Sequence, residues 1–368
     1  MANFKKVFLA TLLLILLASA ACSVKNPFSN KDNTKKTKTE ELRTGTDGIK
    51  IRFLPNNPPA AVFVGENLQN KVDIAVELVN KGVYPQPEER QTITGKLYLS
   101  GYDKNIIKFD TTNQQPFFDL SKTTALYGKT LINSEGGSEV ATFSPQVDKD
   151  RLKVDKYEPI FLATLCYQYK TIAGPSVCID PDPYPTIKQK KVCEVNDITL
   201  TSQGAPIAVT KIEEKALSEK TQFMITVKNV GGGDVLRVGS GTSQAQGTAA
   251  APSQQSGSTI DKCDPFGNSK LIKEDIDKVY VEGITIGDQF LQCWPFAESN
   301  AKSDKGHIRL QNGEGSIICE LLKDYGTGTA GYPGGSTAYT TPLKIELSYA
   351  YKTTAQAKTL LKKEDTGE

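Results

Sequence analysis

The sequence predicts an all-β protein: two tandem immunoglobulin-like β-sandwich domains that follow an N-terminal signal or anchor segment and a flexible tether. Three observations lead to this prediction. An apolar run precedes a polar stretch at the N-terminus, short alternating segments fill the rest of the chain, and two of those segments occur twice. Many short strands separated by turn residues are typical of β-sandwiches.

The N-terminal residues 1–22 have the layout of an export signal. Lys5 and Lys6 precede the apolar run Val7–Ala21, which is followed by Cys22. A membrane-spanning helix needs about 20 apolar residues, and this run is shorter. A cleaved signal peptide is therefore the first interpretation, and an uncleaved anchor helix is the second.

The small residues before Cys22 point to a lipid anchor. Ser19-Ala20-Ala21-Cys22 resembles a lipobox, in which the cysteine becomes the lipidated first residue of the mature protein. The usual Leu three positions before the cysteine is Ser19 here. Ordinary cleavage after Ala20 or Ala21, which would release the protein, is the alternative.

A polar stretch separates this segment from the body. Residues 23–48 lack hydrophobic periodicity and hold too little apolar surface to fold, so we expect a disordered tether. A flexible coil of this length spans roughly 28 Å. We therefore expect the body to be held at the extracellular face of the membrane.

The body contains an internal repeat. Ile74–Gly82 and Phe223–Gly231 both alternate apolar and less apolar residues and end in Asn-x-Gly, as expected for a half-buried strand that runs into a turn. Phe161–Thr171 and Leu343–Thr353 share Leu, Tyr, Tyr, Lys and Thr in register. The repeat predicts two copies of one module.

The two copies set the predicted domain boundaries. We expect the first sandwich over 49–201 and the second over 205–353, followed by a C-terminal tail over 354–368, part of which has a weak helical period. The second copy is longer because of the uncharged segment 239–259, which we interpret as a flexible surface loop. Further strands are expected between the repeated segments, at Ile49–Leu54, Ala61–Val64, Thr94–Leu99, Asn105–Phe109, Ile207–Ile212, Lys278–Ile284, His307–Leu310 and Ser316–Glu320.

The order of these motifs resembles a known group of proteins. The chain reads GTDG, FLPNNPP, ELVNKG, LYLSGYD, LCYQYKT, VCIDPDPYP, VKNVGGG and AYTTPLKIELSYAYKT. It is similar to uncharacterised secreted or lipid-anchored archaeal proteins with paired immunoglobulin-like domains. The strand that ends in Asn-x-Gly also resembles the CARDB group of adhesion-related modules. The resemblance implies fold and location, and it implies no reaction.

Six cysteines remain after Cys22, which in an exported chain predicts disulfides. Because three lie in each copy, at least one either joins the copies or stays free. Cys166 lies on a strand face that is polar in the second copy, so we expect segment 172–192 to fold back over it and to be linked there. A Cys178–Cys193 bond and a Cys166 bond to either of these cysteines both stay open. The six are Cys166, Cys178, Cys193, Cys263, Cys293 and Cys319.

Few residues suggest chemistry. His307 is the only histidine, and alternation places it on the water-facing side of its strand. Asp180 and Asp182 could bind Ca²⁺ or form a hydrolase pair, although a rigid solvated loop is the simpler interpretation. Trp294 is either an exposed aromatic anchor or buried beside a disulfide. The tyrosines at 167, 169, 349 and 351 are interpreted as core rather than as a binding stripe.

Composition narrows the function further. Lys and Arg (44) nearly balance Asp and Glu (42), so no basic field favours nucleic acid. The cysteines lack the spacing of a zinc site, and no catalytic motif is present. We therefore expect a non-catalytic, adhesion-like protein without a cofactor or metal, which binds another surface protein or a glycan. An accessory subunit of a membrane complex and a carboxylate-dependent extracellular hydrolase are the alternatives.

Overall fold

The computed structural model describes residues 42–89, 91–110, 115–185, 190–238, 259–324, 332–333 and 337–364. The chain divides into two compact units, residues 1–37 and 38–368, and every described residue belongs to the second. The predicted signal segment, Cys22 and most of the tether lie outside the described residues. The same is true of nearly all of the predicted loop 239–259.

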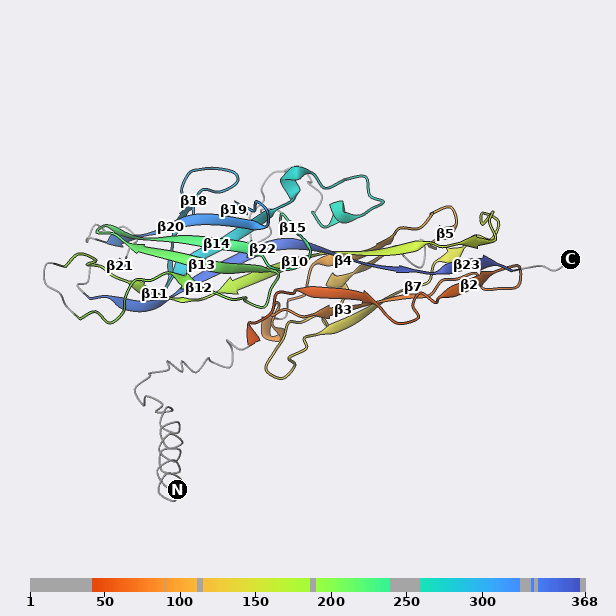
Figure 1. Ribbon diagram of the computed structural model, residues 1–368, viewed down its shortest axis with the longest axis horizontal. Coiled ribbons are helices and arrows are strands. Elements are labelled where there is room, and N and C mark those ends of the chain that lie inside the picture. Colours follow the sequence, from red (N-terminus) through yellow and green to blue (C-terminus); the bar gives the residue numbers. More distant parts are fainter. Residues whose placement is uncertain are drawn as a thin grey trace, which may run out of the picture. The chain divides into compact units, whose positions relative to one another are not determined.

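The described residues form an all-β, sandwich-like body (Figure 1). One sheet comes from the first repeat and has the order β1-β3-β7. Its strands are β1 (Ile49–Phe53), β3 (Ile74–Asn80) and β7 (Ser138–Phe143). A second sheet comes mainly from the second repeat and has the order β12-β13-β14-β20-β18, with β21 paired to β20; its edge strand β12 precedes the expected start of that repeat at residue 205. Its strands are β12 (Ile198–Thr199), β13 (Ile207–Ala216), β14 (Lys220–Asn229), β18 (Gln292–Trp294), β20 (Glu314–Asp324) and β21 (Tyr332–Pro333).

The largest sheet joins the two repeats. Its main order is β17-β16-β22-β10-β4-β6, with β11 and β15 paired to β22 and β19 paired to β16. The strands are β4 (Gly95–Ser100), β6 (Phe117–Asp119), β10 (Ile160–Ala173), β11 (Ser176–Ile179), β15 (Asp234–Leu236), β16 (Lys278–Ile286), β17 (Gln289–Phe290), β19 (Gly306–Arg309) and β22 (Tyr339–Lys358).

Two small sheets and four 3-10 turns complete the described residues. In one small sheet β23 lies between β2 and β9, and in the other β5 pairs with β8. The strands are β2 (Ala61–Val64), β5 (Ile107–Lys108), β8 (Gln146–Val147), β9 (Lys156–Tyr157) and β23 (Leu360–Lys363). The 3-10 turns are η1 (Pro87–Glu89), η2 (Leu120–Lys122), η3 (Asp261–Cys263) and η4 (Lys273–Asp275).

The two longest repeated strands pair with each other. β10 and β22 run antiparallel over all 14 residues of β10, with Tyr167 opposite Tyr351 and Tyr169 opposite Tyr349. In the sequence repeat, Tyr167 corresponds to Tyr349 and Tyr169 to Tyr351. The register therefore relates the two repeats by an approximate two-fold axis, which passes between Gln168 and Ala350.

The C-terminal residues are part of the sheet structure. The weak helical period predicted for the tail is not realised, because β22 continues to Lys358 and β23 follows it. β23 pairs in parallel with β2 and antiparallel with β9, both of which belong to the first repeat. The second repeat therefore ends in a strand that completes a sheet of the first.

Most of the interior is one apolar cluster that includes strands from both repeats, and a second, smaller cluster surrounds Cys166 and Cys263. The predicted tyrosine core is confirmed, since all four rings are buried and each contacts the next along β10 and β22. Alternation along β14 and β20 places Phe223, Ile225, Ile317 and Cys319 inside. The opposite faces of these two strands are left for water or for a ligand.

Candidate functional site

The outer face of β14, β20 and β18 carries a row of apolar side chains. Met224 lies opposite Ile318, and Ile318 lies opposite Trp294, so the three residues cross three neighbouring strands. All three are partly exposed. Trp294 occupies this face because its neighbour Cys293 points inward, where it forms a disulfide with Cys319. We call Met224, Ile318 and Trp294 the Trp294 row.

Charged and amide side chains lie two residues along the strands from this row. Glu320 lies opposite both Gln222 and Gln292. Its carboxylate accepts hydrogen bonds from the ammonium groups of Lys220 and Lys302. The two lysines hold the pKa of Glu320 below its usual value against the opposing effect of burial. The carboxylate is therefore charged at neutral pH and fixed in position.

Lys302 also contacts the tryptophan. Its Nζ lies 4.6 Å from the centre of the Trp294 ring, the geometry of a cation–π contact. The lysine side chain is about half exposed, so it covers the ring without sealing it from water. The result is an aromatic surface beside a fixed carboxylate, with a half-exposed cation above the ring.

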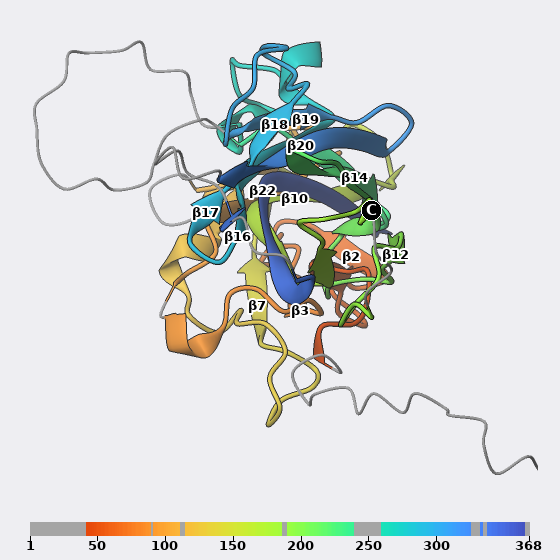
Figure 2. The same cartoon turned by 90° about the vertical axis from the view of Figure 1, so that its left-hand side faces the viewer.

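A groove continues from the Trp294 row toward the turn between β19 and β20. It has a volume of about 640 Å³. Its lining mixes apolar residues such as Pro295 and Phe296 with polar ones, which include Arg309, Gln311, Glu314 and Ser316. Ligand pockets in proteins have volumes of roughly 300–1,000 Å³. The Trp294 row and this groove together form the candidate site, and Figures 1 and 2 show β18 and β20 on one side of the body.

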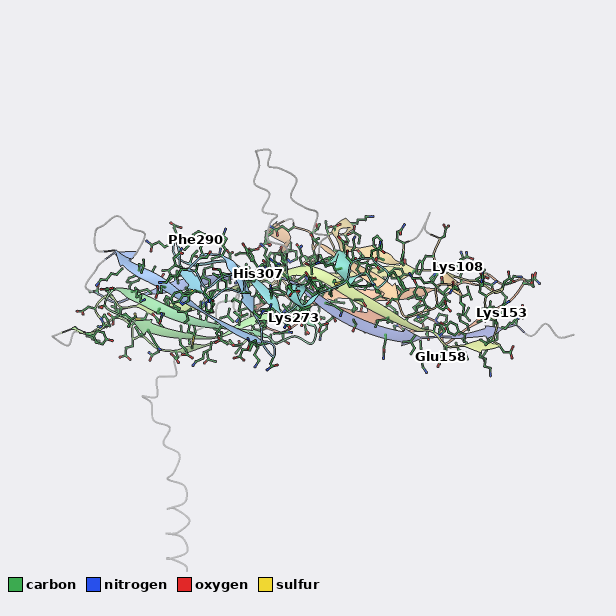
Figure 3. All side chains as sticks on the ribbon, turned by 90° about the horizontal axis from the view of Figure 1, so that it is seen from above. Lys108, Lys153, Glu158, Lys273, Phe290 and His307 are labelled. Atoms are coloured by element: carbon green, nitrogen blue, oxygen red, sulfur yellow. A yellow bond between two sulfur atoms is a disulfide. The ribbon has the colours of Figure 1, made fainter. Side chains whose placement is uncertain are left out.

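His307 supports one wall of the groove. The prediction that it faces water is wrong, because only 2% of its surface is exposed (Figure 3). Its Nδ1 lies 2.7 Å from Glu298 Oε1, and its Nε2 lies 3.2 Å from the carbonyl oxygen of Val238. The segment around Glu298 and the residue Val238 cover the outer side of β19 at His307, whereas Arg309 on the same side stays exposed. Burial lowers the pKa of His307.

Asp180 and Asp182, the predicted carboxylate pair, lie in the loop that follows β11. Asp180 is buried, and one of its oxygens pairs with the Lys191 ammonium group. Its other oxygen accepts a hydrogen bond from the backbone N–H of Asp182 at 3.1 Å, while the Asp182 side chain is exposed. Asp180 therefore fixes the loop after β11, and it is not the solvated side chain that the sequence suggested.

Three disulfides connect the six cysteines: Cys166–Cys263, Cys178–Cys193 and Cys293–Cys319. The first joins the two repeats, which was one of the two outcomes expected from three cysteines in each copy. Disulfides of this kind form and persist in oxidising compartments, which indicates an extracytoplasmic environment.

One expectation about the cysteines is wrong. Cys166 is covered by the segment around η3, together with Leu236 and Ile260 of the second repeat, and not by residues 172–192. The residues after β10 instead form β11, which pairs with the start of β22. The Cys178–Cys193 bond, one of the alternatives left open, closes the loop that follows β11.

A smaller cavity of about 160 Å³ lies where the described chain begins. Its lining includes Leu42, Arg43, Tyr84, Lys129 and Lys170. Among the residues that the structure describes, no group of three or more His, Cys, Asp and Glu side chains is arranged to hold a metal ion. Within the same residues, no helix is long and apolar enough to cross a membrane.

No protein-family model matches the chain, and a search of curated proteins found no match. The residues of the candidate site therefore carry the functional argument.

Proposed function

We propose that the chain is a membrane-tethered, non-catalytic binding protein at the extracellular face of the cell, and that the Trp294 row with its groove binds a surface glycan or protein. Its body would be two tandem immunoglobulin-like sandwiches that share the β10–β22 strand pair. Support for this architecture comes from the two repeats, each of which contributes strands to facing sheets.

The observation that carries the proposal is the arrangement around Trp294. An aromatic ring can pack against the apolar face of a sugar or against an apolar side chain. Glu320, Gln222 and Gln292 offer hydrogen-bond acceptors and donors two residues away along the strands, and the groove adds further polar and apolar side chains beside them. Exposed tryptophan is enriched among residues that dominate binding energy.

Binding can be followed with the protein's own fluorescence, because Trp294 is the only tryptophan. The full chain in vesicles is mixed with cell-envelope fragments, and co-sedimentation is measured together with the emission of Trp294. We expect Trp294→Ala to abolish co-sedimentation and Tyr184→Ala, a change at a well-exposed site outside the groove, to leave it intact. Equal binding by both variants would contradict the proposed site.

Pretreatment of the envelope separates the two ligand classes. Loss of binding after periodate oxidation would identify a glycan, and loss after protease digestion would identify a protein. A stoichiometric membrane partner that co-purifies from the native host would instead favour the accessory-subunit hypothesis.

The tether is tested by the intact mass of protein released from native membranes. A chain that begins at lipidated Cys22 and gains about six hydrogens on reduction supports a lipoprotein with three disulfides. A mass that includes residues 1–21 would make the anchor an uncleaved helix. An unlipidated chain that begins after Ala20 or Ala21 would remove the tether from the proposal.

A further inference from the structure

The turn before β7 exposes two large aliphatic side chains. Ile132 is 99% exposed and Leu131 is 63% exposed, and they are adjacent at the tip of the turn between Thr130 and Asn133. Turn tips are normally occupied by Gly, Asn, Asp, Ser or Pro, whose backbone preferences suit them. Ile132 is almost wholly exposed and Leu131 mostly so, and burial in the described chain therefore does not explain two large aliphatic residues at this place.

The turn is held in one conformation. The Thr130 N–H donates to the Asn133 carbonyl at 2.9 Å, and the Asn133 N–H donates to Thr130 Oγ1 at 2.9 Å. The Asn133 amide donates to the Gly136 carbonyl at 2.9 Å. The base of the turn is attached to the first Asn-x-Gly element, because the Lys129 N–H donates to the Gly82 carbonyl at 2.7 Å.

The second repeat shows what this position looks like without the apolar tip. Gly137 accepts a hydrogen bond from the Asn80 N–H, and Gly313 accepts the equivalent bond from Asn229. In the second repeat the turn before β20 is the short pair Asn312-Gly313, whose positive φ angles of 52° and 80° suit a hairpin. The longer, apolar turn is therefore a feature of the first repeat alone.

The turn lies close to the point where the described chain begins. Lys129 lines the same cavity as Leu42 and Arg43, where the described chain begins. Ile132 is three residues from Lys129, so it lies within about 10 Å of this place. Upstream of Leu42 the sequence contains the apolar run Val7–Ala21 and Cys22. The exposed tip thus lies next to the end of the body from which the proposed tether leaves.

The charges near the turn, and the side of the body from which the turn extends, both suit contact with a lipid bilayer. Lys129 and Arg43 line the cavity at the base of the turn together with one carboxylate, Glu89, and Glu135 is paired with the ammonium group of Lys81. Cations near an apolar tip favour an anionic bilayer surface. The segment leading into β7 extends from the lower side of the body in Figures 1 and 2, whereas β18 and β20 lie on the upper side.

We propose that Leu131 and Ile132 insert into the interface of the lipid bilayer and form a second membrane contact beside the N-terminal anchor. This inference rests on the proposed membrane tether. Transfer of aliphatic side chains from water to the acyl boundary is favourable, and the hydrogen-bonded turn reduces the cost of ordering them at that step. With two contacts the body is oriented, so the Trp294 row faces away from the membrane.

The test uses the full chain in vesicles of phosphatidylcholine and phosphatidylglycerol that carry brominated acyl chains, which quench tryptophan on contact. Ile132→Trp is compared with Phe63→Trp, a matched variant at a 58% exposed aromatic site on β2, and with the unchanged chain as the Trp294 baseline. We expect bromolipid to remove about half or more of the emission added at position 132 and little of that added at position 63.

The outcomes separate this inference from the proposed tether. If the chain floats with the vesicles but position 132 is quenched no more than position 63, the membrane contact of the turn is overturned and the tether stands. If the chain does not float with the vesicles, both are overturned. A blue shift of the added emission that requires higher protein concentration and no lipid would assign the tip to a second copy of the chain and overturn the inference.

Discussion

The hydroxyl of Tyr169 donates a hydrogen bond to Oδ1 of the buried Asn80 at 2.9 Å. The same contact recurs in the second repeat, where the Tyr351 hydroxyl donates to Asn229 Oδ1 at 3.1 Å. The tyrosines lie on β10 and β22. Each asparagine is the last residue of a strand in a different sheet, Asn80 of β3 and Asn229 of β14. The contact therefore ties the shared β10–β22 pair to both Asn-x-Gly turns.

These bonds predict a paired loss of stability. Tyr169→Phe and Tyr351→Phe remove the hydroxyl but keep the ring. Each asparagine Oδ1 then keeps only its backbone N–H donor, and the Tyr84 or Gly233 N–H loses its acceptor. We expect each change to cost about 1–3 kcal/mol of unfolding free energy. Urea denaturation measures this cost. Tyr184→Phe, at an exposed ring, is the control and should change stability little; an equal loss there would contradict the assigned role.

The Cys166–Cys263 bond predicts a link between the repeats. Its partners are 97 residues apart in the sequence, so it constrains the unfolded chain strongly. We expect the double change Cys166→Ala and Cys263→Ala to cost roughly 2–5 kcal/mol. Non-reducing peptide mapping of the unchanged chain should recover a peptide pair that contains both cysteines. A recovered Cys166–Cys178 pair would show that the residues after β10 fold as the sequence alone suggested.

Much of the strand pattern can be predicted from the sequence, because a half-buried strand has a period of two. Ala61–Val64 was expected at the bounds that β2 has, and β10 and β22 contain their predicted segments. The sequence motif also placed the four tyrosines in the core. It gave no indication that β10 would pair with β22, because periodicity identifies a strand but not its neighbour.

The errors have a common physical origin. His307 was assigned to water from the alternation of its strand, and Cys166 was expected to be covered by residues 172–192, the segment that follows it in the sequence. In the structure, His307 on the outer side of β19 is covered by Val238 and the segment around Glu298, and Cys166 of β10 by the segment around η3. Such a covering segment comes from a distant part of the chain, so alternation cannot reveal it. The groove beside Trp294 was missed for the same reason, since it depends on the turn between β19 and β20.

Glu214 should make the protein less stable as pH rises. It is 6% exposed, its Oε2 accepts the Cys178 N–H at 3.3 Å, and its Oε1 has no hydrogen-bond partner among the described residues. Burial raises its pKa from 4.5 to about 7. The native state therefore holds this proton between these two pH values while the unfolded state releases it, so the native state loses stability across this window.

The replacement Glu214→Gln removes the titration. Relative to the unchanged chain, we expect the variant to gain stability between pH 4.5 and 7, by a total on the order of 3 kcal/mol, and to differ by a constant amount above pH 7. Chemical denaturation at a series of pH values gives this difference. Parallel pH profiles for the two proteins would show that Glu214 does not titrate in the native state within this window.

His307 should make the protein more stable as pH rises, which is the opposite of the effect of Glu214. Because burial lowers its pKa below 6.5, the unfolded state binds the proton more readily than the native state. The contribution of the neutral ring is present above pH 6.5 and is lost as pH falls below it. We expect His307→Gln to flatten this part of the stability profile, and the Glu298→Gln variant, which removes the facing carboxylate, to steepen it. A profile that is unchanged in His307→Gln would contradict the prediction.

The contact between Lys302 and the Trp294 ring should limit how far that ring is exposed to solvent. Its ammonium group lies over the Trp294 ring and pairs with Glu320, so Lys302→Ala should open the ring to solvent without exposing the core. Since Trp294 is the only tryptophan, acrylamide quenching of intrinsic fluorescence reports this site alone. We expect quenching to increase in Lys302→Ala and to stay unchanged in Lys305→Ala, a nearby exposed lysine. Lys220 still neutralises Glu320 in the variant, so the unfolding free energy should fall by no more than about 1 kcal/mol. If quenching is the same in all three proteins, the ring is already open, and Lys302 does not control access of a ligand to the Trp294 row.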